Sequence, residues 1–334
     1  MRVIVDAMGG DNAPLEIVKG AVQAANDNHI DIILVGKKDE INEILSTETV
    51  TGNVTVVHAE EVIDNHEQPT EAVKNKKDSS MVKAFQMLKD GEGDALVSAG
   101  STGALLVAAI RYMGRIKGVI RPALAATLPG KASNVLLLDS GANTNCRPAN
   151  FQQFGIMGAA YVENLWKIPR PKVGLLNIGA EDSKGDETTK EAYELLEQAD
   201  INFGGNIEGR DIMEGEFPVV VADGFSGNVA LKSIEGTAKV LMSYLKDALT
   251  KNLKSKLGAM LIMDGLKDMK KKADYENTGG APLLGIDGVV IKAHGSSRAK
   301  SVYWCVKQAN EFAETRLVDR IRGEIEKVKK AEEN

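Results

Sequence analysis

Short apolar runs alternate with amphipathic segments along almost the whole chain. The apolar runs are rich in Val, Ile, Leu and Ala and lack a period of two, which is typical of strands buried on both faces. They predict strands at residues 2–6, 31–35, 54–58, 94–98, 123–128, 135–139, 172–177, 219–222 and 289–292. Helical patterns lie between them at residues 14–28, 79–88, 104–112, 151–164, 187–198, 228–249 and 297–328. This order predicts an α/β protein with a mainly parallel sheet.

Six loops follow the carboxyl ends of predicted strands. In open α/β sheets ligands bind at this edge, so we expect these loops to converge on one site. The loops are residues 6–14, 98–106, 139–144, 177–187, 222–232 and 292–297. No clean boundary or low-complexity linker divides the 334 residues, so we predict a single domain over residues 1–334.

Charge and cysteine content limit the possible functions and cellular compartments of the protein. The formal net charge is −6, which argues against a basic nucleic-acid-binding protein. Cys146 and Cys305 lack any CxxC or zinc spacing and are typical of free thiols in a reducing compartment. The apolar start is too short for a signal peptide, and no stretch reaches transmembrane length. We expect a protein of the cytoplasm or of its membrane surface.

Common catalytic motifs are absent from the sequence. It contains no GxxxxGK[ST], no GxGxxG after a strand, no GxSxG and no HExxH. With only four histidines, a His-rich metal site is not expected. We therefore predict neither a metal nor a cofactor, and the Gly/Ser/Thr/Asn loops are the candidate binding elements.

Two of these loops can be explained by anion binding or by helix capping. In SAGSTGALL, backbone N–H groups with Ser98, Ser101 and Thr102 could hold an anion at a helix N-terminus. Ser or Thr before an apolar helix is also a common N-cap. The loop DAMGGDNAP could bind substrate through its carboxylates, or form a tight turn in which Asn12 or Asp11 caps the next helix.

Two further segments carry candidate cations. Asn228 and Lys232 lie one helical turn apart on the same face, so they could hold a phosphate or a carbonyl oxygen together. A capped helix with a solvated lysine is the alternative. His294 directly follows an apolar strand and precedes Gly295, Ser296 and Ser297, which favours a functional role over a structural one.

Two stretches are locally basic. Residues 69–88 hold several lysines, which are either a solvated face or a surface for an acidic partner. Residues 246–272 contain eight lysines and three aspartates, a balance of 8 − 3 = +5, around an apolar run at 257–266. This pattern predicts a basic amphipathic helical hairpin that contacts a membrane surface, a dimer partner or both.

Eight motifs follow one another along the chain in a specific order. They are DAMGGDNAP, KNKKDSSM, GDALVSAGSTGALL, DSGANT, NIGAEDSKGDE, GNIEGRDI, DGFSGNVALKSIEG and GAPLLGIDGVVIKAHGSS. Together they resemble the PlsX family of phosphate acyltransferases, which make acyl phosphate from acyl-acyl carrier protein. The resemblance covers essentially the whole chain, and GNVALK is also similar to the GNxxxK segment of phosphate acetyltransferases.

The resemblance implies a three-layer fold like that of isocitrate and isopropylmalate dehydrogenases, with two interwoven subdomains around a cleft. It also implies a homodimer that associates peripherally with the cytoplasmic membrane. The expected activity transfers a long-chain acyl group from acyl-acyl carrier protein to inorganic phosphate for phospholipid synthesis. Phosphate is already an anionic nucleophile and a thiolate leaves readily, so alignment and oxyanion donors would suffice.

Matching the loops to this reaction gives each candidate residue an expected role. The catalytic set is Lys184, Asn228, Lys232 and His294. Substrate and phosphate binding is expected at Asp6, Gly9, Gly10, Asp11, Ser98, Gly100, Ser101, Thr102, Asp139, Asn143, Asp223, Ser296 and Ser297. Acyl carrier protein would dock on Lys74, Lys76, Lys77, Arg111, Arg115 and Arg121. Membrane contact is expected at Leu257, Met260, Leu261, Ile262 and Met263.

Three other functions stay open on the sequence alone. A short-chain phosphate acyltransferase acting on acyl-coenzyme A would share the phosphate loops but would not need a basic docking face. A dehydrogenase of the same fold is disfavoured by the missing nucleotide fingerprint. A non-catalytic scaffold of lipid synthesis at the membrane would use the basic hairpin but would not need the polar loops.

Overall fold

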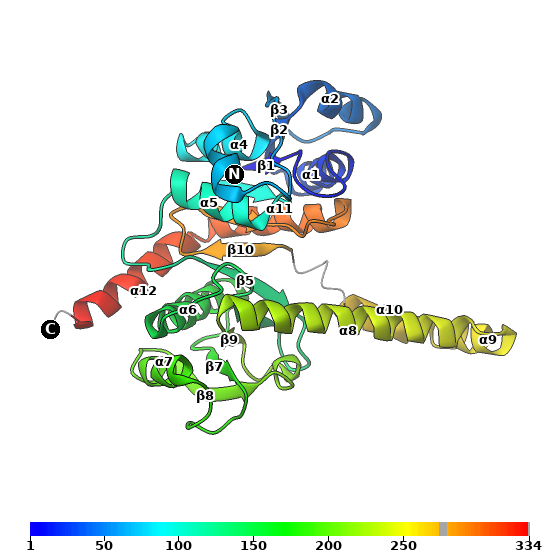
Figure 1. The fold of residues 1–334 in the computed structure, drawn as a ribbon. Helices are drawn as coiled ribbons and strands as arrows, with labels where there is room; N and C mark the ends of the chain where they lie inside the picture. Colours follow the sequence, from blue (N-terminus) through cyan, green and yellow to red (C-terminus); the bar gives the residue numbers. More distant parts are fainter. Residues whose placement is uncertain (274–278, 333–334) are drawn as a thin grey trace.

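The computed structural model describes residues 1–273 and 279–332, which form one 11-stranded sheet with helices on both faces (Figure 1). The strands are β1 (Arg2–Asp6), β2 (Asp31–Gly36), β3 (Val54–His58), β4 (Ala95–Ser98), β5 (Ala123–Leu128), β6 (Val135–Leu138), β7 (Lys172–Asn177), β8 (Asn202–Glu208), β9 (Val219–Val221), β10 (Ala281–Leu284) and β11 (Val289–Lys292). The helices are α1 (Leu15–Asn28), α2 (Lys38–Thr47), α3 (Pro69–Asn75), α4 (Ser80–Lys89), α5 (Thr102–Tyr112), α6 (Pro148–Tyr161), α7 (Glu187–Glu197), α8 (Gly224–Thr250), α9 (Leu253–Leu261), α10 (Met263–Ala273), α11 (Ala299–Glu314) and α12 (Leu317–Glu332).

The sheet consists of two parallel parts joined by antiparallel strands. Its order is β3-β2-β1-β4-β11-β10-β5-β6-β9-β7-β8. Neighbours are parallel everywhere except at β11–β10, β10–β5 and β5–β6. The chain crosses between the parts more than once, because β10 and β11 return from the C-terminal half to the N-terminal one. This confirms the predicted α/β class with its mainly parallel sheet.

Alternate residues of the buried strands face opposite helix layers. Val3 and Val5 pack in the cluster that includes α1 and α11, whereas Ile4 between them packs against α4 and α5. This alternation is the two-residue period of a strand, hidden in the sequence because both faces are apolar. In the second part, α6 covers one face and the first turns of α8 cover the other, so the fold has three layers.

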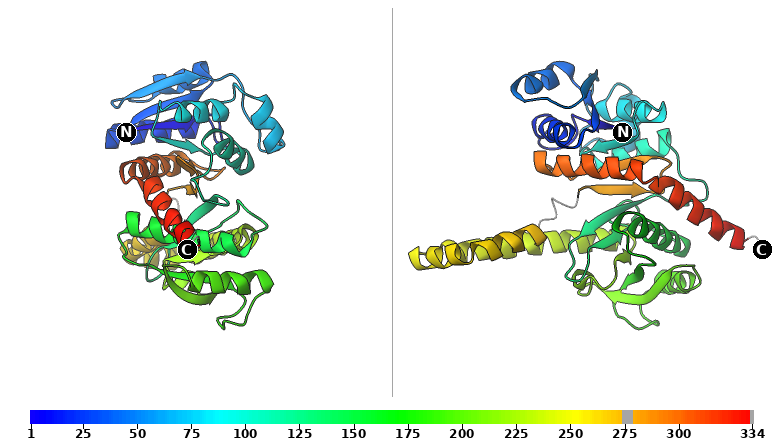
Figure 2. Two further views of the ribbon diagram at one scale, coloured as in Figure 1. Left: turned by 90° about the vertical axis from the view of Figure 1, so that its left-hand side faces the viewer. Right: turned by 180° about the vertical axis from the view of Figure 1, so that it is seen from behind.

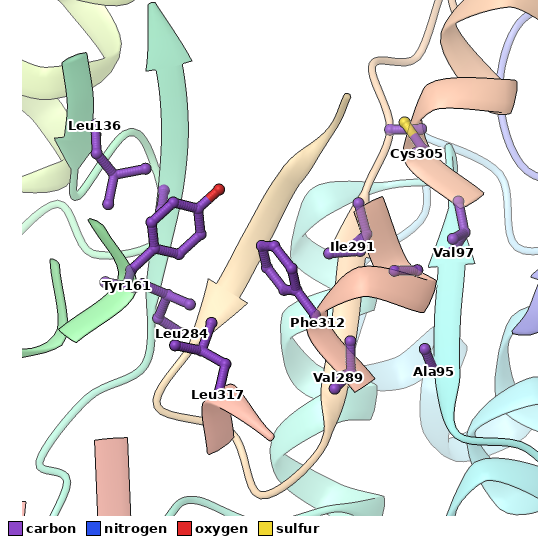
Figure 3. Packing of buried hydrophobic residues seen from close by; sticks show 14 of the residues in the cluster. Ala95, Val97, Leu136, Tyr161, Leu284, Val289, Ile291, Cys305, Phe312 and Leu317 are labelled. Atoms are coloured by element: carbon purple, nitrogen blue, oxygen red, sulfur yellow. The ribbon is translucent and has the colours of Figure 1, made fainter. Parts of the chain in front are cut away.

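One hydrophobic core spans both parts of the sheet. Phe312 of α11 meets Tyr161 of α6 edge to face, with ring centroids 5.3 Å apart. In Figure 3, Phe312 lies between Tyr161 on one side and Ile291 on the other. The two parts therefore share buried side chains and do not fold around separate cores.

The segment after Thr250 forms an arm with α8. Figures 1 and 2 show α8 leaving the body as a long rod, with α9 at its far end and α10 running back beside it. The segment 246–272, for which a basic amphipathic hairpin was predicted, comprises the end of α8, then α9 and most of α10. Leu257, Met260, Leu261, Ile262 and Met263 are exposed near the end of the arm, and Leu261 is 89% accessible.

Several element predictions were wrong in detail. The sequence patterns missed α2, α3, β8 and β10. The strand β8 was not predicted because it is a polar edge strand, NFGGNIE, with two glycines. The predicted helix at 297–328 is two helices, since Arg316 adopts a left-handed φ of 52° between α11 and α12. None of the described helices is long and apolar enough to cross a membrane.

Candidate active site

A cavity of about 520 Å³ lies between the first turns of α8 and the strand β5, at the junction of the two parts of the sheet. Helix α8 contributes one face of side chains, which are Asn228, Leu231, Lys232, Ile234, Glu235 and Ala238. The opposite wall comes from β5 with Leu124, Ala126, Thr127 and Leu128. Thr102, Ser140, Gly141 and residues 292–295 also line the cavity, and the lining is completed by Pro129, Met213, residues 279–281 and Ser301. Four of the six predicted loops, 98–106, 139–144, 222–232 and 292–297, thus meet at one site.

Lys232 and His294 form the cationic centre of this cavity. The ammonium of Lys232 lies 3.3 Å from His294 Nε2 and 2.7 Å from a carboxylate oxygen of Glu235. Burial of the His294 ring lowers its pKa, so the ring is mostly neutral at pH 7. The backbone N–H of Ser296 donates to Nδ1, so we assign the proton of the neutral ring to Nε2. Lys232 and the Nε2–H of His294 are then neighbouring donors on the cavity lining, and one anionic acceptor in the cavity could bind both.

The structure adds Lys292, which the sequence analysis missed. It is only 8% exposed, ends β11 and lines the cavity. Its ammonium donates to the carbonyl oxygens of Ala99, at 3.4 Å, and of Ala293. Burial lowers its pKa to about 8. The available signal was a single lysine closing an otherwise apolar strand, VVIK, directly before the HGSS loop.

The predicted loops 6–14, 98–106 and 292–297 pack directly on one another. The backbone N–H of Asp11 donates to the carbonyl of Gly295 at 2.8 Å. Asp6 is buried and accepts a 2.6 Å hydrogen bond from Ser98, and burial raises its pKa. A Cβ on Gly9 would lie 2.6 Å from the backbone nitrogen of Gly100, so only glycine permits this approach. Asp6, Gly9 and Ser98 therefore hold the loops together behind the cavity wall.

Capping explains one of the two ambiguous loops and not the other. Ser101 accepts from the backbone N–H of Ala104 and caps α5, while Thr102 lines the cavity. Helix α1 has no side-chain cap. The amide of Asn12 instead donates to the carbonyl of Ser296 at 3.1 Å, which ties the first loop to the last. Gly10 has a φ of +102° beside Gly295, which accounts for the second glycine of the pair.

Three predicted polar residues of the second part shape the cavity indirectly. Asp139 is fully buried and accepts from the backbone N–H groups of Leu124 and Ala142, and from both nitrogens of Asn143. Asp223 caps α8 by accepting from the backbone N–H groups of residues 225 and 226. These bonds fix the loop after β6 and the start of α8, so they position Asn228 and Lys232.

The structure does not bring every predicted residue to the cavity. Lys184 lies in the loop between β7 and α7, is not part of the cavity lining, and its ammonium is 3.9 Å from Glu181. Gly100 packs against Met81. Ser297 is buried with its hydroxyl 3.3 Å from that of Ser301, and the hydroxyl of Ser296 lies 2.8 Å from His294 Nδ1. The catalytic role of Lys184 stays a prediction.

Of the basic residues expected to dock a partner, Lys74 lies in α3, Lys76 and Lys77 directly after it and Arg111 in α5, whereas Arg115 and Arg121 lie in the loop between α5 and β5. Lys74, Lys77, Arg111, Arg115 and Arg121 are exposed. Lys76 differs, because its ammonium pairs with Glu67 at 2.6 Å and also bonds the carbonyl of Val62. That bond also lowers the pKa of Glu67. Lys76 therefore contributes less free positive charge than its neighbours.

Solved structures with this fold include enzymes of acyl transfer and of oxidation. The chain superimposes on a phosphotransacetylase from Streptococcus pyogenes with a TM-score of 0.62, 16% identity and 94% of each chain covered. A putative 4-hydroxythreonine-4-phosphate dehydrogenase from Salmonella typhimurium gives a TM-score of 0.55 at 11% identity, over 93% of this chain and 98% of that one. These similarities concern the fold alone, and they confirm the dehydrogenase-like architecture.

Sequence relatives are much closer. The phosphate acyltransferase of Thermoanaerobacterium thermosaccharolyticum is 51% identical over 326 residues, 98% of this chain and 97% of the relative. That of Oceanobacillus iheyensis is 47% identical over 334 residues and covers both chains completely. Residues 1–320 match the family described as fatty acid synthesis protein. The chain therefore belongs to the PlsX family of phosphate acyltransferases, the fatty acid synthesis proteins.

Proposed function

We propose that the cavity transfers a long-chain acyl group from acyl-acyl carrier protein to inorganic phosphate, giving acyl phosphate for phospholipid synthesis. The observation that carries the proposal is that one cavity joins a cationic centre to an apolar wall. Lys232 and His294 would bind phosphate through charge and hydrogen bonds. Leu231 and Ile234 of α8, with Leu128 of β5 and Met213, would bury the acyl chain.

The proposed reaction is a direct displacement at the thioester. A phosphate oxygen attacks the carbonyl carbon, the new C–O bond forms as the C–S bond breaks, and the sulfur leaves as a thiolate that takes a proton from solvent. Lys232 and the Nε2–H of His294 orient the phosphate, and the Asn228 amide donates to the developing oxyanion. Burial raises the pKa of Cys146 to about 11 and that of Cys305 to about 12, so neither supplies a thiolate nucleophile at neutral pH.

Thiol release from purified palmitoyl-acyl carrier protein tests this function. Release should require phosphate, and hydroxylamine should trap the acyl group of the product. Acetyl-coenzyme A, offered at the same concentration, should react far more slowly because an acetyl group fills none of the apolar wall. Faster release from acetyl-coenzyme A would favour the short-chain alternative, and no release from either donor would contradict acyl transfer.

Docking of acyl carrier protein should depend on salt. The carrier is acidic, and the exposed cations in and after α3 and α5 would attract it over a distance that salt screens. Raising the salt concentration from 50 to 500 mM should increase the KM for the acylated carrier about tenfold and leave the KM for phosphate nearly unchanged. The variant Lys77→Glu should increase the first KM at low salt, whereas Lys190→Glu, on α7, should not. A KM for the acylated carrier that does not change with salt concentration would indicate that the carrier docks through apolar contacts.

We also propose that the arm forms a homodimer and holds the protein at the cytoplasmic face of the membrane. Exposed apolar side chains are concentrated along α8–α10, and contiguous apolar surface is typical of protein or membrane contact sites. Val240, Leu241 and Tyr244 are exposed in the middle of α8 and suit a second copy of the helix. The apolar end of the arm, with Lys251, Lys254 and Lys256 nearby, suits an anionic lipid surface.

A pair of variants separates the two roles of the arm. Leu261→Glu at the end of the arm should abolish sedimentation with vesicles that contain anionic lipid, and the oligomeric state should stay unchanged. Leu241→Glu in the middle of α8 should instead weaken the dimer in analytical ultracentrifugation. Leu241 is 59% exposed, so the monomer should tolerate the change. Unaltered vesicle binding by Leu261→Glu would mean that the arm serves the dimer alone.

A further inference from the structure

We propose that Lys292 is a buried phosphate-binding residue, which holds the acceptor phosphate by a direct ion pair on the side of the cavity opposite to α8. The inference rests on the proposed function, since it names an additional group for the same acceptor. It enlarges the expected cationic centre from Lys232 and His294 to three residues on two elements.

The burial of Lys292 is the first argument. Lysines are almost never fully buried without a partner, because removing an ammonium from water costs several kcal/mol. Lys292 is 8% exposed, and among the described residues no carboxylate lies within ion-pair distance of its ammonium. The direct partners of its ammonium among the described residues are thus two carbonyl oxygens, while Asp6 and Asp11 attract the charge only from a longer distance. A bound anion would supply the missing countercharge.

The direction of the ammonium is the second argument. An ammonium has three N–H donors, and two of them go to the carbonyls of Ala99 and Ala293. These two acceptors fix the side chain in place, and Lys292 lines the cavity. In the sheet Lys292 pairs in register with Ser98, which sets it beside the SAGST loop. The remaining donor is available to a ligand oxygen in the cavity.

The charged groups around Lys292 favour an exchangeable anion over a permanent partner. Asp6, behind the loops, is buried with a raised pKa, and it attracts the Lys292 ammonium only from beyond ion-pair distance. Asp11 is an exposed carboxylate on the adjoining loop, and Cys305 of α11 is held as a neutral thiol by burial. Lys232 of α8 also lines the cavity, and its charge repels that of Lys292. An oxyanion bound between the two ammonium groups, with the neutral His294 as a further donor, would relieve this repulsion.

A pH dependence follows from the geometry and the burial together. Burial lowers the pKa of Lys292 to about 8, so the free protein carries the ammonium below that pH and loses it above. Phosphate affinity should therefore fall as the pH rises through about 8. Burial lowers the pKa of His294 below its ordinary value, so His294 titrates at lower pH. It therefore does not cause the fall in phosphate affinity near pH 8, the alkaline limb of the profile.

Phosphate binding to the full-length protein tests the proposal without any acyl donor. The rise in Tm on adding inorganic phosphate measures binding to the folded state. In Lys292→Met this response should require phosphate concentrations on the order of 10- to 100-fold higher, the usual loss for one hydrogen bond to a charged group. Lys292→Arg should recover most of the response and move the alkaline limb beyond pH 9. Lys239→Met, an exposed lysine of α8 outside the cavity lining, is the matched control.

Each possible outcome decides the matter. If Lys292→Met is folded and responds to phosphate as the unchanged protein does, Lys292 does not bind phosphate. A lower kcat with an unchanged phosphate response would assign the ammonium to the thioester oxyanion and overturn the proposal. Failure of acyl transfer with intact, Lys292-dependent phosphate binding would contradict the proposed reaction and leave this inference standing.

Discussion

Replacing Lys232 by Met should lower kcat/KM for phosphate on the order of 100-fold while the protein stays folded. Lys232 is the α8 residue whose ammonium meets the imidazole of His294 at 3.3 Å inside the cavity. Loss of one charged donor that faces a reacting anion usually costs 10²- to 10³-fold in rate. Phosphate carries negative charge both before and during the reaction, so KM should rise and kcat should fall.

The folded state should tolerate this change because Lys232 is half exposed. Its side chain is 50% accessible, and its ion pair with Glu235 is of the partly solvated kind that contributes about 1 kcal/mol or less. Lys232→Arg keeps the charge and should retain more activity than Lys232→Met. Lys239→Met removes a lysine from the same helix outside the cavity and should behave like the unchanged protein. Equal kinetic constants for Lys232→Met and Lys239→Met would show that Lys232 does not contribute to phosphate binding or to catalysis.

Gly227→Ala should destabilise the protein by about 3 kcal/mol or more, the largest effect expected from a single methyl group. Gly227 lies in the first turn of α8, and a Cβ there would overlap the carbonyl oxygen of Asp139. That oxygen belongs to the loop whose backbone is fixed by the buried Asp139 carboxylate, so it cannot move aside cheaply. The change should also lower activity, because α8 would shift and carry Asn228 and Lys232 with it.

Gly323→Ala is the matched control for this prediction. Gly323 lies inside α12, and a Cβ there would meet no atom within 4 Å. Alanine in a helix interior is more favourable than glycine by about 1 kcal/mol, so this variant should be slightly more stable. Chemical denaturation of both variants measures the difference. A Gly227→Ala variant as stable as the unchanged protein would mean that the close packing of α8 on the 139–144 loop is not required.

The elements that the sequence predicted well are those whose pattern follows from burial alone. Strands such as β1 and β2 are continuous apolar runs because helices cover both of their faces. The strand β8 has no such pattern, since it lies at the sheet edge and contains two glycines. Its pairing with β7 is a tertiary effect that local sequence does not encode.

The site was predicted in part for a similar reason. Loops after buried strands were expected to meet, and the cavity joins Thr102, Asn228, Lys232 and His294 from three of them. Lys292 was not among the predicted site residues, because a lysine at the end of a strand normally reaches solvent. Only the fold shows that this lysine is enclosed. Asp139 and Asp223 looked like substrate ligands in the sequence, yet their carboxylates are occupied by backbone N–H groups.

The pattern of initial rates tests most directly whether the cavity holds both substrates at once. Rates would be measured against palmitoyl-acyl carrier protein at several fixed phosphate concentrations, together with thiol release in the absence of phosphate. We expect intersecting double-reciprocal lines and no burst of thiol without phosphate, because phosphate attacks the bound thioester directly. Parallel lines with a stoichiometric burst would indicate an acyl-enzyme intermediate and would contradict direct transfer.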